Sequence, residues 1–189
     1  RSVVKTATPL FVPIVLDVVS GTARFTTELA LTNRGAVAVD AVLAYAAQLG
    51  ERKGSGSVRL TLAAGRQLVI PDVLAELRNR GLSIPAATEG QQGGTLLVTF
   101  EGAADPAHVA ASARTTSATA EPVGAAGLAY PALRSRDGSS SALAVFGLRS
   151  DAADRSNLAV FNPGAEPVIS RRRQHHRREH RSASMAPAG

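Results

Sequence analysis

Apolar and polar residues alternate along most of this chain, and Gly, Pro, Asn or Asp interrupts the alternation at short intervals. In residues 24–33, Phe25, Thr27 and Leu29 are expected to share one face. Such a period of two is typical of strands that bury one side. We expect strands over residues 11–21, 24–33, 36–49, 58–62, 66–70, 94–102, 108–118, 127–130, 142–148 and 157–162.

The turn signals between these strands favour an antiparallel sheet. Asn33-Arg34-Gly35 predicts a tight turn because Asn and Gly tolerate positive φ, and the polar segment 50–57 predicts a hairpin loop. Hairpins in succession give a sheet with one solvated face. Many short strands with turns between them are typical of sandwiches and barrels, so we expect an all-β protein built as an antiparallel β-sandwich.

One short helix is predicted, over about residues 72–80. Pro71 and Asp72 stand at its start, Arg78 and Arg80 fall in its last turn, and Gly81 supplies a stop. We interpret this helix as a connection between parts of the sheet.

Composition narrows the picture. The chain has no Cys and no Trp, and its aromatic share is 4%. The core must therefore be built from Val, Leu, Ile and Ala, and a disulfide framework or thiolate metal site is excluded. No apolar run is long enough for a transmembrane helix. The chain opens at Arg1 without a charged and then apolar leader, so we expect that a leader was removed or that Arg1 is a cut.

The basic charge is confined to one end. The net charge is +6, and residues 171–189 hold six Arg and one Glu, which leaves +1 for residues 1–170. We expect this tail to be disordered and outside the fold. It is either a genuine basic extension or the product of a lost reading frame, because out-of-frame GC-rich codons give Arg, His, Ala, Ser and Pro. The strand expected after residue 170 is missing, which favours the second interpretation.

Several motifs resemble a repeat found in large, uncharacterised secreted proteins of soil bacteria such as acidobacteria. The resemblance covers roughly residues 10–163. It is carried by PIVLDVVSGTARFTTELAL (13–31), TNRG (32–35), GGTLLVTF (93–100), SARTTSA (112–118), GLAYP (127–131) and GLRSDAADRSNLAVFN (147–162). It implies immunoglobulin-like β-sandwich modules in series, an extracellular or cell-envelope location, and no known catalytic residues.

The resemblance also implies a division of the chain. Residues 1–133 would form one immunoglobulin-like module, 134–141 a linker, 142–170 the incomplete start of a second β module, and 171–189 the tail.

Two groups of side chains are candidate metal ligands. His176 and His180 are four residues apart, with His175 beside them, so on a helix they would share a face suited to zinc or nickel. The neighbouring Arg side chains repel cations, however. In a second group, Asp151, Asp154 and Asn157 offer oxygen donors for calcium, but their spacing is not that of an EF-hand and no distal Glu follows. Turn capping explains these three residues as well, and we expect no cofactor.

The tail could bind anions through its arginines, which are Arg171, Arg172, Arg173, Arg177, Arg178 and Arg181. No aromatic side chains are interleaved with them to stack on bases, so sequence-specific nucleic-acid binding is not expected.

No catalytic constellation is evident. Before the tail, His108 is the one histidine, and it lies near Asp105 without a G-x-S-x-G motif to supply a nucleophile. Glu101 and Asp105 lie at a strand end and a turn, which does not indicate a glycosidase pair.

The sequence therefore predicts a non-catalytic extracellular or cell-surface module that spaces, adheres or binds. Its partners would be neighbouring β modules or a protein or glycan surface, met through loops 50–57 and 82–94 or an exposed sheet edge. The alternative is an anion-binding protein that uses its tail to contact nucleic acid or an acidic polymer.

Overall fold

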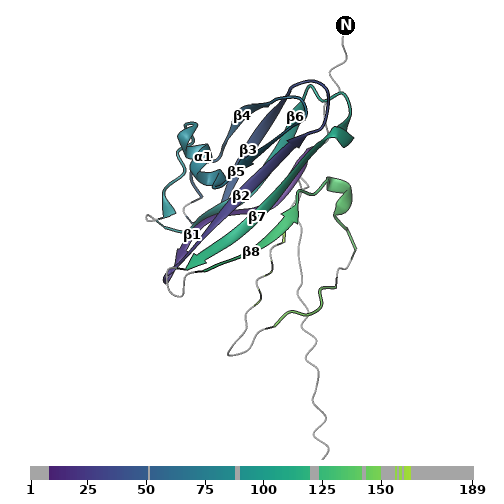
Figure 1. The fold of residues 1–189 in the computed structure, drawn as a ribbon. Coiled ribbons are helices and arrows are strands. Elements are labelled where there is room, and N and C mark those ends of the chain that lie inside the picture. Colours follow the sequence, from purple (N-terminus) through teal and green to yellow (C-terminus); the bar gives the residue numbers. More distant parts are fainter. Residues whose placement is uncertain are drawn as a thin grey trace, which may run out of the picture.

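The computed structural model describes residues 9–50, 52–87, 90–119, 124–141, 144–149, 156, 158 and 160–162. Its described part is an antiparallel β structure with one short α-helix (Figure 1). The strands are β1 (Leu10–Ser20), β2 (Ala23–Asn33), β3 (Val39–Leu49), β4 (Gly56–Leu62), β5 (Arg66–Ile70), β6 (Gln92–Glu101), β7 (Val109–Thr119) and β8 (Gly124–Pro131). The helices are α1 (Val73–Asn79) and the 3₁₀ turns η2 (Pro106–His108) and η3 (Ser135–Asp137). The expected all-β class with one short helix is confirmed.

The strands form one sheet in the order β4-β3-β6-β1-β2-β7-β8, and β5 pairs with β2. The β1–β2 ladder is short and joins Asp17–Ser20 to Ala23–Thr26. Beyond it the two strands diverge, since β1 continues along β6 while the rest of β2 pairs with β5. The sheet therefore curls, and its concave face encloses the core.

A short bridge ties the end of the sheet back to its middle. Phe11 and Leu133 exchange two backbone hydrogen bonds of 2.7 Å, so the chain leaving β8 is held against β1. At the far side, β4 and β5 follow each other through a turn at Gly65, whose φ of +64° favours glycine.

The predicted faces are those that the core uses. Thr27, Leu29 and Leu31 of β2 are buried. So are alternate residues of β4 and β7, which are Leu60, Leu62, Val109, Ala111 and Ala113. Phe25 of β2, which is expected on the same face as Thr27 and Leu29, is half-buried. Val12, Val98 and Phe100 are also fully buried between them. Aliphatic side chains thus fill the interior, as the low aromatic content requires.

Helix α1 agrees with its prediction. Asp72 is the N-cap, and its side chain accepts a hydrogen bond from the backbone N–H of Ala75. Gly81 has a φ of +98°, which ends the helix in the left-handed region. Val73, Leu74 and Leu77 are buried against the sheet, so packing rather than length stabilises this helix of seven residues.

Two sequence predictions are wrong in detail. The strand expected from residue 36 begins at Val39, because residues 34–38 form a loop that Asn33 holds. The strands expected over 142–148 and 157–162 are absent from the residues described there, 144–149, 158 and 160–162. An alternating pattern becomes a strand only when a neighbouring strand pairs with its backbone along its length. In the described residues of this segment the printed backbone contacts join Arg149 to Ser156 and form no ladder.

Candidate functional site

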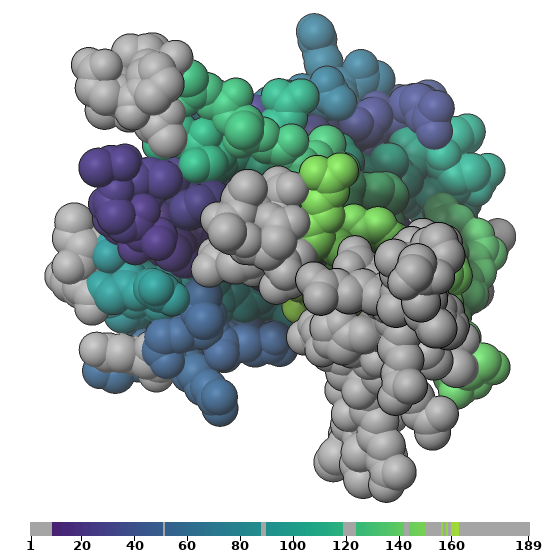
Figure 2. Space-filling view, turned by 90° about the horizontal axis from the view of Figure 1, so that it is seen from below, coloured from purple at the N-terminus to yellow at the C-terminus, as the bar shows by residue number. Residues whose placement is uncertain are grey.

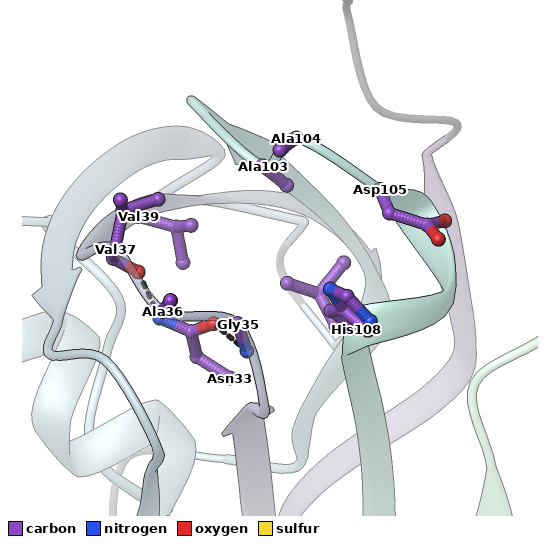
Figure 3. Close-up of a pocket in the computed structure, with 10 residues that line it drawn as sticks. Asn33, Gly35, Ala36, Val37, Val39, Ala103, Ala104, Asp105 and His108 are labelled. Atoms are coloured by element: carbon purple, nitrogen blue, oxygen red, sulfur yellow. Dashed lines mark hydrogen bonds between the residues drawn. The ribbon is translucent and has the colours of Figure 1, made fainter.

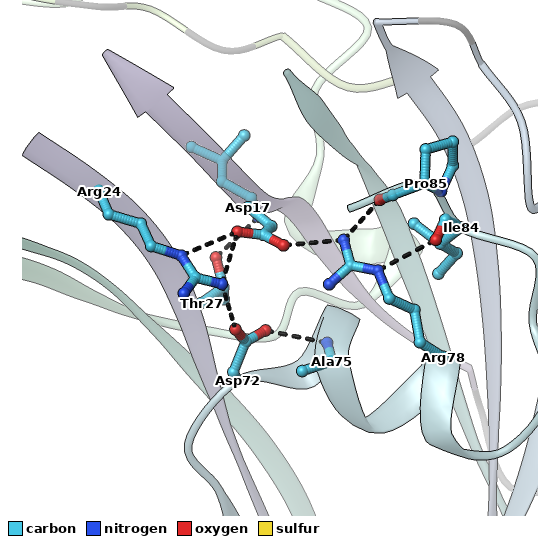
Figure 4. A network of polar contacts seen from close by, with 9 residues as sticks. Asp17, Arg24, Thr27, Asp72, Ala75, Arg78, Ile84 and Pro85 are labelled. Atoms are coloured by element: carbon cyan, nitrogen blue, oxygen red, sulfur yellow. Dashed lines mark hydrogen bonds and ion pairs between the residues drawn. The ribbon is translucent and has the colours of Figure 1, made fainter. Parts of the chain in front are cut away.

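The most buried charge of the described residues lies where helix α1 meets the sheet. Asp17 of β1 is fully buried and contacts two arginines (Figure 4). Arg24 of β2 approaches Asp17 Oδ1 at 3.1 Å, and Arg78 of α1 approaches Oδ2 at 2.8 Å. Arg24 also reaches the helix N-cap, Asp72, at 3.4 Å. Each charge in this cluster therefore has an opposite charge beside it.

Arg78 holds a loop in place as well as the carboxylate. Its Nε donates to the carbonyl of Ile84 at 3.0 Å, and its Nη2 donates to that of Pro85 at 2.7 Å. The guanidinium therefore joins β1, α1 and the segment that leads to β6. With both carboxylate oxygens of Asp17 facing arginine, the cluster offers no free base, and we interpret it as structural.

A second cluster of polar side chains lies where β1 diverges from β2. The N–H of Leu16 donates to Thr27 Oγ1 at 2.8 Å, and the hydroxyl of Tyr130 donates to the carbonyl of Ile14 at 2.6 Å. Between them Thr115 Oγ1 lies 3.0 Å from both hydroxyls. Because the Tyr130 hydroxyl already donates to the backbone, it accepts from Thr115. Thr115 in turn accepts from the hydroxyl of Thr27. This chain of hydroxyls satisfies two backbone groups of β1, the N–H of Leu16 and the carbonyl of Ile14, which lie just beyond the residues where β1 pairs with β2.

Four buried polar atoms have no hydrogen-bond partner among the described residues: Asp17 Oδ2, Tyr45 Oη, Gln92 Nε2 and Thr95 Oγ1. The first of them is compensated by its ion pair with Arg78 at 2.8 Å. Burial raises the pKa of Tyr45 to about 12, and the nearby positive charge of Arg78 opposes that rise. The Tyr45 ring lies over Gly94, where an added Cβ would come within 2.9 Å of Cε2. The phenol is thus held neutral in a closed space and is not activated as a base.

His108, for which the sequence indicates no catalytic partners, lines a small hollow at the other end of the sheet (Figure 3). The hollow measures about 190 Å³. Its lining residues are Asn33, Gly35, Ala36, Val37, Val39, Ala103, Ala104, Asp105, His108 and Val109. The Asp105 carboxylate accepts from the N–H of Ala107 at 2.8 Å, and no ion pair joins it to His108 in the described structure. The lining has no Ser, Thr, Cys, Lys or Tyr, so the hollow pairs no hydroxyl, thiol or amine nucleophile with His108.

The two loops proposed as binding faces come together. Gly54 of loop 50–57 lies so close to Ile84 that an added Cβ would stand 2.6 Å from its Cα. Arg78 donates to the carbonyl of the same residue, Ile84. The described parts of these loops therefore cover the core.

The two edge strands of the sheet differ in their chemistry. At the β4 edge, Arg59 forms ion pairs with Asp40 of β3 and Glu101 of β6, and Thr61 donates to Asp40. These bonds to Thr61 and Arg59 lower the pKa of Asp40. Strand β8, at the lower edge in Figure 1, has no charged side chain and no strand on its outer side among the described residues.

One side chain of β8 is exposed on the face that should be buried. Leu128 is directly opposite Thr115, and opposed residues share a face of the sheet. Thr115 points inward to the hydroxyl chain, yet Leu128 is 71% exposed. The opposite part of the curled sheet does not reach over this end of β8. The open β8 edge, meaning residues 124–130 with Leu128 uncovered, is the candidate binding site.

A second exposed apolar stretch follows η3. Val145, Phe146 and Leu148 are exposed, Phe146 to 88%, and the light-green residues of this part lie on the surface in Figure 2. Phe161 packs its ring against Phe11 of β1, with 5.2 Å between the ring centroids. This stretch therefore touches the sheet through Phe161 while its other described apolar residues stay uncovered.

The candidate ligands predicted in the C-terminal part lie outside the described residues. These are Asp151, Asp154 and Asn157 for calcium, His176 and His180 for zinc or nickel, and the tail arginines from Arg171 to Arg181. Within the described ranges no cluster of three or more His, Asp or Glu is placed to hold a metal ion. The same residues include no helix that is long and apolar enough to cross a membrane.

No protein-family model matches the chain, and neither a curated protein nor a solved structure matches it.

Proposed function

We propose that this chain is a non-catalytic β module that binds an extended polypeptide segment along the open β8 edge. The observation that carries the proposal is Leu128, a core-facing side chain that is 71% exposed on an uncharged edge strand. An edge with unpaired N–H and C=O groups is a template for strand addition unless charge or cover blocks it. Strand β4 has such charges in the Arg59 ion pairs, and β8 does not.

The other polar groups support a non-catalytic role. Asp17 is neutralised by two arginines, the pKa of Tyr45 is raised, and the hollow that His108 lines contains no Ser, Thr, Cys, Lys or Tyr. None of these arrangements gives the paired nucleophile and base that covalent catalysis requires.

The proposal includes a cellular location for this module. The resemblance to secreted bacterial repeat proteins supports an immunoglobulin-like module in the extracellular space or the cell envelope. There, a neighbouring β module can present the segment that β8 takes up, and the exposed stretch around Phe146 offers a further apolar contact.

A peptide-binding measurement tests the proposal. The probe is a fluorescent peptide as long as β8 with alternating Val and Thr, and fluorescence anisotropy reports binding. We expect saturable binding that Leu128→Lys abolishes, because a lysine on an edge strand blocks strand addition. Ser57→Lys, which places the same charge on exposed Ser57 of β4, is the matched control and should bind as the parent does. Equal binding by both variants, or none by the parent, would refute the proposal.

A further inference from the structure

The β8 edge is complementary to itself, which identifies one partner for it. Two copies of β8 can run antiparallel only in registers that keep core-facing residues together, so even-numbered residues must meet even-numbered ones. Ala126, Leu128 and Tyr130 share the inward face, because they are opposite Ser117, Thr115 and Ala113 in an unbroken ladder.

One of these registers pairs more residues of β8 than the neighbouring register allows. If Gly127 pairs with Gly127 of the partner subunit, all seven residues from 124 to 130 pair, and Leu128 lies opposite the partner's Ala126. A large side chain then meets a small one on both sides of the axis. Shifting the centre to Leu128 would bring Pro131 into the ladder, and proline has no N–H to donate.

We propose that a second copy of this chain pairs with β8 through this two-fold register, so that two curled sheets join edge to edge. The inference rests on the proposed function, because it names the partner for the same edge. Such an interface is isologous and closes with two copies. Its neutral strands carry no charge that would repel a copy, and Leu128 of each subunit becomes covered by the other.

The oligomeric state tests pairing between copies. In sedimentation equilibrium the full chain should shift from monomer to dimer as its concentration rises, without larger species. Leu128→Lys should weaken the association roughly tenfold or more, because it puts a charge beside the partner's strand. Ser57→Lys should associate as the parent does. If the parent chain stays monomeric at every concentration, the proposed dimer is refuted. The proposed function would still be tested separately by the peptide-binding measurement.

Cross-linking tests the register, since the chain has no native Cys to interfere. Ala126→Cys and Leu128→Cys proteins are mixed and oxidised at a concentration where the dimer forms. The proposed register predicts mixed disulfide dimers well in excess of either homodimer, because these two positions lie opposite each other across the axis. A Ser57→Cys protein, with its thiol on the other edge, should remain uncross-linked. If Leu128→Cys gives chiefly its own homodimer, or Ser57→Cys cross-links as readily, the register is wrong.

Discussion

At the scale of single residues, the feature with the largest expected effect on stability is the buried carboxylate of Asp17. A fully buried charge is tolerated only when opposite charges and hydrogen bonds compensate for its lost hydration. Arg24 and Arg78 supply that compensation from two different elements. Removing the carboxylate would leave the less exposed guanidinium, that of Arg78, beside a neutral group.

We therefore expect Asp17→Asn to lower the free energy of unfolding by roughly 3 kcal/mol, as for other broken buried pairs. Glu76→Gln is the control, because Glu76 pairs with Arg80 on the exposed side of α1. That exposed pair should contribute less than about 1 kcal/mol. Urea unfolding followed by circular dichroism measures both. Equal losses for the two variants would contradict the assigned role of Asp17.

The two tyrosines make a second prediction at this scale. Burial raises the pKa of Tyr45 to about 12, and it also raises that of Tyr130 above its usual value. Between pH 10 and 12 the unfolded chain therefore releases phenolic protons that the folded chain retains. The free energy of unfolding should fall as the pH rises through that window, and below it this contribution is fully present.

Tyrosinate absorbance measures this directly, since Tyr45 and Tyr130 are the only tyrosines of the chain. The folded protein should titrate later than the protein in urea. Tyr45→Phe should halve the signal and leave Tyr130 as the remaining late step. Stability should not drop in that variant, because the Tyr45 hydroxyl has no hydrogen-bond partner among the described residues to lose. A native titration that coincides with the unfolded one would contradict the prediction.

At the scale of elements, the hydroxyl chain explains how β1 can leave β2 without unsatisfied backbone groups. Thr115→Val keeps the shape of the side chain but removes the central hydroxyl between Thr27 and Tyr130. We expect a loss of about 1–2 kcal/mol in unfolding free energy, as for a broken buried hydrogen bond.

Thr116→Val is the matched control for Thr115→Val. It has the same chemistry one position along β7, on the opposite face of the strand. It should change stability little, since valine suits a strand at least as well as threonine does. If the two variants unfold at the same urea concentration, the hydroxyl chain contributes nothing measurable.

Elements could be predicted from the sequence where the residues that start and stop them lie close by in the chain. The start and stop of α1 depend on Asp72 and Gly81, which lie within a few residues of the helix. The partnership of Arg78 was not predictable in the same way. The sequence placed Arg78 in the last turn as a charge that suits the helix dipole, whereas in the structure it reaches Asp17, 61 residues away. Spacing along the chain carries no information about such a contact.

At the scale of the whole molecule, charge and fold are separate properties. Every described strand ends by Pro131, while the basic excess lies in residues 171–189. Removing those residues changes the net charge from +6 to +1.

We expect truncation after Ser170 to abolish retention on heparin at moderate salt, because binding to a polyanion follows the number of basic contacts. The β signal in circular dichroism should stay unchanged. Heparin retention that survives the truncation would instead place an anion-binding surface on the folded body. Loss of the β signal would show that the tail supports the sheet.

The sequence by itself determined the all-β class, the positions of most strands from residue 10 to residue 131, most of their buried faces and helix α1. These depend on the alternation of side chains and on turn residues, which act over a few positions. Only the tertiary structure decided that β1 diverges from β2, that Asp17 meets Arg78, and that β8 keeps an open edge with Leu128 uncovered. A strand's own pattern says which face it buries, but its neighbours depend on packing among all the strands at once. The candidate site is a property of that arrangement, which is why the candidate residues named from sequence do not include Leu128.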